Sequence, residues 1–199
     1  MNIIEIFTES LSLIFSFDKD LWEIILLSLY VSLVALIFAS IFGLLISYHL
    51  ALRNFFFKNF ILIILNSLMG IPPVVVGLIV YFMFASGGPL GVLQLLYTPT
   101  AMIIAQVIII FPIVTSISHE IFDQNFREYK DQLRSINMPF FGVAFIITKH
   151  SYFLVITALL SAFGRAISEV GAVMIVGGNI NHFTRVMTTA ISLETRMGN

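Results

Sequence analysis

Long uncharged apolar runs alternate with shorter polar segments along this sequence of 199 residues. Four of the runs are long enough to cross a lipid bilayer, because a membrane-spanning helix needs about 20 mainly apolar residues. A membrane β-barrel would instead show segments of about ten residues in which polar and apolar positions alternate. The pattern therefore predicts an all-α protein, a polytopic bundle of transmembrane helices, with runs at residues 24–48, 60–84, 100–118 and 151–177.

The composition agrees with a membrane location and excludes several classes of function. Charged residues make up 11% and hydrophobic residues 59% of the chain, whereas a soluble domain carries about 25% charged residues. The net charge of −1 gives no electrostatic basis for binding nucleic acid. The chain has no cysteine, and its histidines show no metal-ligand spacing, so no disulfide, metal site or cofactor is expected; these are His49, His119, His150 and His182.

Basic residues predict how the chain is oriented, because lysine and arginine concentrate in cytoplasmic loops. The loop after the first run contains Arg53 and Lys58, and segment 119–150 contains further basic residues. The N-terminal stretch is mainly acidic, and the loop 85–99 carries no charge. We therefore expect the N-terminus outside, with residues 1–20 as an external amphipathic segment on the outer surface.

The last segment of the sequence, residues 179–199, is moderately polar and able to form a helix. With the orientation given above it lies outside, and no further apolar run follows it. The expected architecture is therefore a single transmembrane domain over residues 1–199 that lacks a final C-terminal transmembrane helix.

The second apolar run contains two adjacent prolines, Pro72 and Pro73, about half-way along its length. Each proline removes a backbone donor, so the carbonyls of Leu68 and Met69 are expected to lose their usual helical partners. Within lipid this is tolerated where protein or a water-lined cavity satisfies them. Broken helices are common at transport pathways, which makes this a candidate pathway element; the alternative is a simple packing kink.

The fourth run contains two charged residues, Arg165 and Glu169, four positions apart and therefore on one face of a helix. A charge inside the membrane costs at least about 2.5–3.5 kcal/mol and normally faces protein or water. We interpret the pair as the lining or gate of a pathway; the alternative is a structural pair that fixes helix packing. The interleaved small residues, which permit close helix approach, are Gly164, Ser168 and Gly171.

Segment 119–150 is the longest polar stretch. Residues 127–136 can form a short amphipathic helix, Asn137 suits a helix end, and Pro139 prevents continuation. A second helical run, 140–149, leads back to the membrane. The pattern predicts a helix–turn–helix knob on the cytoplasmic face; the alternative is an ordinary solvated loop.

Motifs for enzymatic chemistry are missing from the sequence. It contains no G-x-x-x-x-G-K-[ST] phosphate-binding loop, so the chain cannot hydrolyse a nucleotide by that route. No Ser-His-Asp arrangement or pair of carboxylates occurs in an apolar run. We therefore expect a non-enzymatic protein without catalytic residues.

Several stretches resemble tungstate ABC-transporter permeases, and more loosely molybdate and sulfate permeases. The closest resemblance is the run GRAISEVGAVMIVGGN at residues 164–179. It continues in LMGIPPVVVGL at 68–78, TPTAMIIAQ at 98–106 and TRVMTTAISLE at 184–194. The resemblance covers nearly the whole chain. It implies a type I ABC importer permease, whose members continue with one more apolar helix after the segment ending near residue 199.

The resemblance also gives the cytoplasmic knob a role. Importers of this kind carry a loop of the form E-A-A-x-x-x-G, whose helix docks in a groove of the ATPase. In this sequence Asp131 stands for the glutamate and Asn137 for the glycine, and Ile147 matches a later isoleucine. The two alanines are replaced, and His150 stands where a proline is usual. The implied coupling residues are Asp131, Gln132, Leu133, Arg134, Ser135, Ile136, Asn137 and Met138.

The function implied by the resemblance is ATP-driven import of tungstate across a bacterial inner membrane. The permease would form a homodimer in the lipid bilayer, receive the anion from an extracytoplasmic oxyanion-binding protein, and be driven by separate ABC ATPase subunits. The alternatives are a molybdate or sulfate permease, or a stand-alone channel or secondary transporter that uses Arg165 and Glu169 as an ion site. The helical knob favours the ATP-driven importer.

Overall fold

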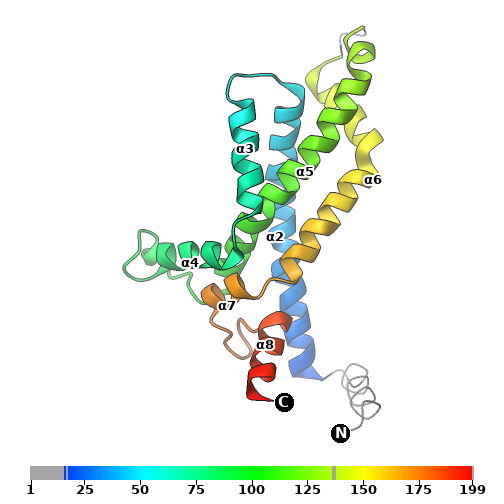
Figure 1. The fold of residues 1–199 in the computed structure, drawn as a ribbon. Coiled ribbons are helices and arrows are strands. Elements are labelled where there is room, and N and C mark those ends of the chain that lie inside the picture. Colours follow the sequence, from blue (N-terminus) through cyan, green and yellow to red (C-terminus); the bar gives the residue numbers. More distant parts are fainter. Residues whose placement is uncertain (1–15, 17, 136–137, 199) are drawn as a thin grey trace.

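The computed structural model describes residues 16, 18–135 and 138–198. Within them the chain is helical without a strand, so the all-α prediction is confirmed (Figure 1). The expected N-terminal amphipathic segment falls mostly outside the described residues. The elements are α2 (Lys19–Leu52), α3 (Lys58–Met69), α4 (Pro73–Phe84), the 3-10 helix η1 (Gly91–Leu93), α5 (Pro99–Ser135), α6 (Phe140–Ile167), α7 (Gly171–Gly177) and α8 (Met187–Met197).

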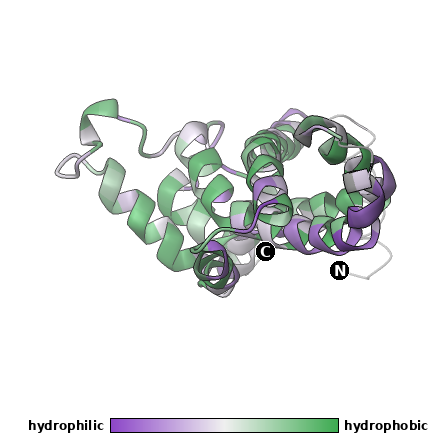
Figure 2. Cartoon of the chain, turned by 90° about the horizontal axis from the view of Figure 1, so that it is seen from above, coloured by the Kyte–Doolittle hydropathy of each residue, from purple (hydrophilic) through white to green (hydrophobic). Residues whose placement is uncertain are grey.

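Three helices, α2, α5 and α6, are each long and apolar enough to cross a membrane. They run along the long axis of the molecule, and α5 and α6 meet at one end of it, opposite to α8 (Figure 1). Seen from above, hydrophobic residues cover most of the helical ribbon (Figure 2). This distribution is expected where lipid is the solvent, and it confirms a polytopic membrane bundle.

The second predicted span is not a single helix. It consists of α3 and α4, which are bent by 99° at the Gly70–Pro72 break. Each has 12 residues, or about 18 Å, so α4 alone is too short to cross a hydrocarbon core of about 30 Å. The carbonyl of Leu68 does not lose its partner as expected, because the N–H of Ile71 donates to it in a turn (3.2 Å).

The fourth predicted span also ends earlier than expected. Helix α6 stops at Ile167, and a separate short helix, α7, follows from Gly171. Glu169 therefore lies in the break between the two helices and not on the helix face that carries Arg165. This corrects the prediction of one helix over residues 151–177.

Helix α2 packs along α5 through a stripe of small residues. Small side chains at helical spacing let two membrane helices approach closely. At Gly43 an added Cβ would lie 3.0 Å from Cγ1 of Val114, which shows how close the α2–α5 contact is. The buried small residues of α2 are Ser28, Ser32, Ala35, Ala39, Gly43, Ser47 and Ala51.

A second core cluster lies toward the end where α5 and α6 meet. It is built around Phe122 of α5 and Ile147 of α6, both fully buried. The ring of Tyr48 on α2 stacks on Phe122 at 4.0 Å between centroids. This cluster fixes α2, α5 and α6 to one another near the end where α5 and α6 meet.

Candidate functional site

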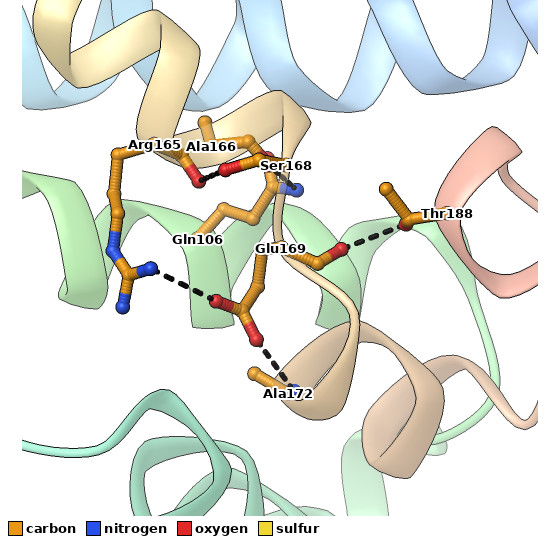
Figure 3. Close-up of polar contacts among 7 residues, drawn as sticks. All are labelled: Gln106, Arg165, Ala166, Ser168, Glu169, Ala172 and Thr188. Carbon is orange, nitrogen blue, oxygen red and sulfur yellow. Dashed lines mark hydrogen bonds and ion pairs between the residues drawn. The ribbon is translucent and has the colours of Figure 1, made fainter. Parts of the chain in front are cut away.

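The carboxylate of Glu169 holds the break between α6 and α7 in place (Figure 3). Its Oε1 accepts a hydrogen bond from the N–H of Ala172 at 3.1 Å, in the first turn of α7. An acidic group in this position compensates unpaired N–H groups at the start of a helix. The hydroxyl of Thr188 in α8 donates to the backbone carbonyl of Glu169 at 2.8 Å. One residue thus joins three helical segments.

Arg165 and Glu169 come together, as the sequence predicted, although not on one helix. The Nη1 of Arg165 lies 3.9 Å from Oε2 of Glu169, which is an ion pair beyond hydrogen-bonding distance. Only 7% of the Glu169 side chain is exposed, against 42% for Arg165. The carboxylate is therefore a fixed part of the protein interior, while the guanidinium remains accessible.

Gln106 of α5 is a site residue that the sequence interpretation missed. Its Nε2 donates to the carbonyl of Ala166 at 3.0 Å and so binds α5 to the last turn of α6 (Figure 3). The side chain is 4% exposed. The available signal was a lone amide inside an otherwise apolar run, since such a group needs a partner within lipid.

A cavity of about 440 Å³ brings the two predicted pathway elements together. Its wall is almost wholly apolar, with residues of α2, α3 and α5 and the α3–α4 break. Ile71, next to Pro72, and the Arg165 side chain both line it. An accessible positive charge on an apolar wall is suited to transient contact with an anion. The single guanidinium attracts the anion but does not surround it with ligands.

The start of α4 lies against the start of α7, where Val74, the residue after Pro73, lies beside Gly171. A Cβ at Gly171 would lie only 2.5 Å from Cγ2 of Val74, so glycine is needed there. Gly164 and Ser168 do not make such a contact. Apart from the backbone of its own helix turn and its chain neighbours, no atom lies within 4 Å of a Cβ built at Gly164, and the Ser168 hydroxyl donates to the carbonyl of Arg165.

Gly77 of α4 makes an equally close contact with α7, because an added Cβ would lie 2.6 Å from the Cα of Ala172. We expect Gly77→Ala to force α4 away from α7 and to lower the free energy of unfolding by about 1–3 kcal/mol, as overpacking does. Thermal unfolding of the purified chain in lipid nanodiscs measures this. Gly87→Ala is the matched control, since nothing lies within 4 Å there; equal melting temperatures for both variants would contradict the prediction.

The predicted knob is the tip at which α5 and α6 meet. Helix α5 runs unbroken to Ser135, so residues 127–135 extend a long helix and do not form a separate short one. Asp131, Gln132 and Ser135 are exposed, and Met138 is half-buried against the second core cluster. Leu133 and Arg134 lie in the last turns of α5. Ile136 and Asn137 lie outside the described residues.

An ionic cluster links α3 to α5 near this tip. Asp123 of α5 forms an ion pair with Arg127 at 2.8 Å and accepts a hydrogen bond from the Nζ of Lys58 in α3 at 3.4 Å. The Lys58 and Asp123 side chains are only 13% and 18% exposed. The cluster couples the start of α3 to the helix that forms the tip.

His182 takes part in a cluster that its position in the sequence did not reveal. Its Nδ1 lies 3.0 Å from Oε2 of Glu23 and 4.0 Å from Oδ1 of Asp20. The three residues could hold a metal ion. The sequence predicted no metal site, because the histidines lack metal-ligand spacing. All three side chains are more than a third exposed, and the contact of His182 with Glu23 is a hydrogen bond that links the α7–α8 loop to α2.

Comparison with known proteins identifies the family to which the chain belongs. Residues 37–198 match the family described as binding-protein-dependent transport system inner membrane component. The chain belongs to this family. It is therefore a membrane permease component of an ABC importer, a transport subunit and not an enzyme. The family implies an ATPase and a binding protein as partners.

Three curated relatives resemble the permease over most of its length. A probable anion ABC transporter permease protein of Haloferax volcanii is 40% identical over 177 residues, which cover 86% of this chain and 76% of the relative. The tungstate uptake system permease protein TupB of Peptoclostridium acidaminophilum is 38% identical, with coverage of 98% and 86%. TupB of Campylobacter jejuni is 34% identical, with coverage of 96% and 80%.

Proposed function

We propose that this permease imports tungstate, which a separate extracytoplasmic binding protein delivers and ATP hydrolysis drives. Two of the relatives described above are named tungstate uptake permeases, at 38% and 34% identity. The Arg165 guanidinium on the cavity wall supplies the positive charge that an oxyanion needs along its path. Molybdate and sulfate are also tetrahedral dianions, and the transport test below includes both.

One observation carries the proposed mechanism: the same two helices form both the tip and the gate. Asp131 near the tip and Gln106 at the gate lie on α5, 25 residues apart in the sequence, or about 38 Å along the helix. Gln106 holds the end of α6 through Ala166, and α6 returns from the tip. Because α5 continues from Pro99 to Ser135 as one helix, with Pro112 inside it, a push at residues 131–135 is passed along this helix toward Gln106 and the Arg165–Glu169 break.

The permease acts as a homodimer in this proposal, with the pathway between the two copies. The lining of the Arg165 cavity includes Phe42 and Ile46 of α2, and Phe42 is 55% exposed. A second copy against this face would complete the wall of a pathway that one chain forms only in part. The tip then faces the cytoplasm and docks with an ATPase subunit. The start of α2 and helix α8, at the other end of the bundle (Figure 1), face outward.

Reconstitution tests the proposal. Proteoliposomes containing the permease, its ATPase and its binding protein are expected to accumulate tungstate only when ATP is supplied inside. Molybdate and sulfate added in excess measure selectivity: tungstate uptake should persist in excess sulfate. Uptake by the permease alone, driven by an ion gradient, would contradict the importer mechanism. Sulfate uptake at the expense of tungstate would contradict the substrate.

A further inference from the structure

A small polar cavity lies where α2, α5, the α6–α7 break and α8 meet. The centre of a water-sized sphere can move within about 10 Å³ of it, which is about the space needed for one water molecule. Five of the side chains in its wall offer an oxygen atom: Ser28, Ser32, Gln106, Glu169 and Thr188. The cavity is distinct from the apolar cavity beside Arg165.

The amide of Gln106 is only half satisfied. Its Nε2 donates to the carbonyl of Ala166, which fixes the orientation of the amide, since a flipped amide would place two oxygens against each other. Its Oε1 is fully buried and accepts no hydrogen bond from any described residue. A buried acceptor without a donor is costly and rare in folded proteins. A donor small enough to enter the cavity is therefore required.

None of the other oxygens in the wall donates to Oε1 of Gln106. The Thr188 hydroxyl already donates to the Glu169 carbonyl, and the Ser28 hydroxyl donates to the carbonyl of Ile24 at 2.8 Å. The carboxylate of Glu169 only accepts, and its one hydrogen bond within range is the 3.1 Å bond from Ala172. The Ser32 hydroxyl also lines the cavity, and it makes no hydrogen bond to Oε1 of Gln106. The wall is thus rich in oxygen atoms that can accept a hydrogen bond.

We propose that this cavity holds one ordered water molecule, which donates to Oε1 of Gln106 and to a second oxygen of the wall. A water molecule has two O–H donors and fits the available volume. A monovalent cation of similar size is the less favourable occupant, because the Arg165 guanidinium already faces the Glu169 carboxylate at 3.9 Å. The water links Gln106 of α5 to the element that carries this second oxygen, close to the residue that caps α7.

Where the second oxygen is that of Thr188, the bound water links α8 to α5, the helix that carries the tip. Without it, the contacts among described residues in this region are the Thr188–Glu169 bond and the bond from the Met187 N–H to the Ser28 hydroxyl at 2.7 Å. With the bound water, the amide of Gln106 also takes part in the hydrogen bonds of this region. The cavity and its hydrogen bonds are the same whichever anion the permease transports.

The direct test is a density map of the wild-type permease in lipid nanodiscs at a resolution that shows ordered water. We expect one peak at about 2.7–3.2 Å from Oε1 of Gln106, with equal occupancy in sodium chloride and in choline chloride. In Ser32→Val an additional methyl group enters the cavity, and the peak should be lost. Ser47→Ala is the control, because Ser47 is also buried on α2 but does not line the cavity; the peak should remain.

Three results would overturn the proposal. The first is a wild-type map in which the Gln106 oxygen accepts from a protein group and the cavity holds no peak. The second is a peak that appears only in sodium chloride, which identifies a cation. The third is a peak that persists unchanged in Ser32→Val. The wild-type map decides the question even if the Ser32 variant does not fold.

Discussion

Replacing Glu169 by leucine is expected to reduce tungstate uptake at least about tenfold and to destabilise the permease. The substitution removes the acceptor for the N–H of Ala172 and the carboxylate that faces Arg165. A hydrogen bond to a charged group contributes about 1.5–3 kcal/mol, and 1.4 kcal/mol corresponds to a factor of ten in an equilibrium constant. Losing the bond therefore allows α7 to leave its position at the break.

The variant Glu169→Gln separates the two roles of this side chain. Glutamine keeps an oxygen for the N–H of Ala172 but removes the charge beside Arg165. We expect its melting temperature to stay close to that of the wild type while uptake still falls, because the guanidinium is no longer held at the break. Uptake is measured in proteoliposomes with all components present, and melting temperature in nanodiscs.

Glu120→Leu is the matched control for these variants. Glu120 is an exposed glutamate of α5, and substitutions at exposed positions usually change stability by less than about 0.5 kcal/mol. Wild-type uptake by an intact complex carrying Glu169→Leu would show that the pair has no part in transport. Equal losses in Glu169→Leu and Glu120→Leu would show that any glutamate substitution has this effect.

Local sequence signals predicted the parts of the fold that depend on local chemistry. The length of the apolar runs identified α2 and α5 as spans, because crossing lipid requires a helix of that length. Pro72 and Pro73 predicted a disturbance, since the residue before a proline avoids the helical region. Pro72 has φ −58° and ψ 127°, and Pro73 begins the next helix, which is where proline is favoured.

The sequence could not predict the direction of the chain after each break. The 99° bend between α3 and α4 depends on how α4 packs against α7, through Gly77 and Ala172, which are nearly 100 residues apart. The last turn of α6 is held to α5 by the bond from Gln106 to Ala166, 60 residues apart in the sequence. The contact of His182 with Glu23 joins residues 159 apart. Such contacts follow from tertiary packing and leave no periodic signal.

The spacing of small residues in α2 is a further sequence signal that bears on the site. The small residues of α2 recur every three or four positions from Ser28 to Ala51, a spacing that indicates a close helix–helix contact within a membrane. It predicts that α2 packs closely against another helix of the bundle. The partner of the Gln106 amide would still have remained unknown, since it is a backbone carbonyl of α6.

Reversing the charge of Asp131 is expected to uncouple the permease from its ATPase. Asp131 is exposed in the last turns of α5, at the position of the acidic residue in the coupling motif that the sequence resembles. Truncating one member of a buried charged contact at an interface costs about 2–5 kcal/mol, and a reversed charge adds repulsion. We therefore expect Asp131→Lys, alone or with Arg134→Glu, to reduce ATP-dependent uptake at least about tenfold.

The cause of that loss can be assigned, because Asp131 is exposed and its substitution should leave the fold intact. Affinity purification of the complex should recover less ATPase with Asp131→Lys, while the melting temperature of the permease stays unchanged. Glu120→Lys makes the same reversal on the same helix, 11 residues earlier and about 16 Å from Asp131, and should retain the ATPase. Uptake that survives Asp131→Lys together with Arg134→Glu would show that force enters the permease elsewhere, and the continuous α5 would then serve only as scaffold.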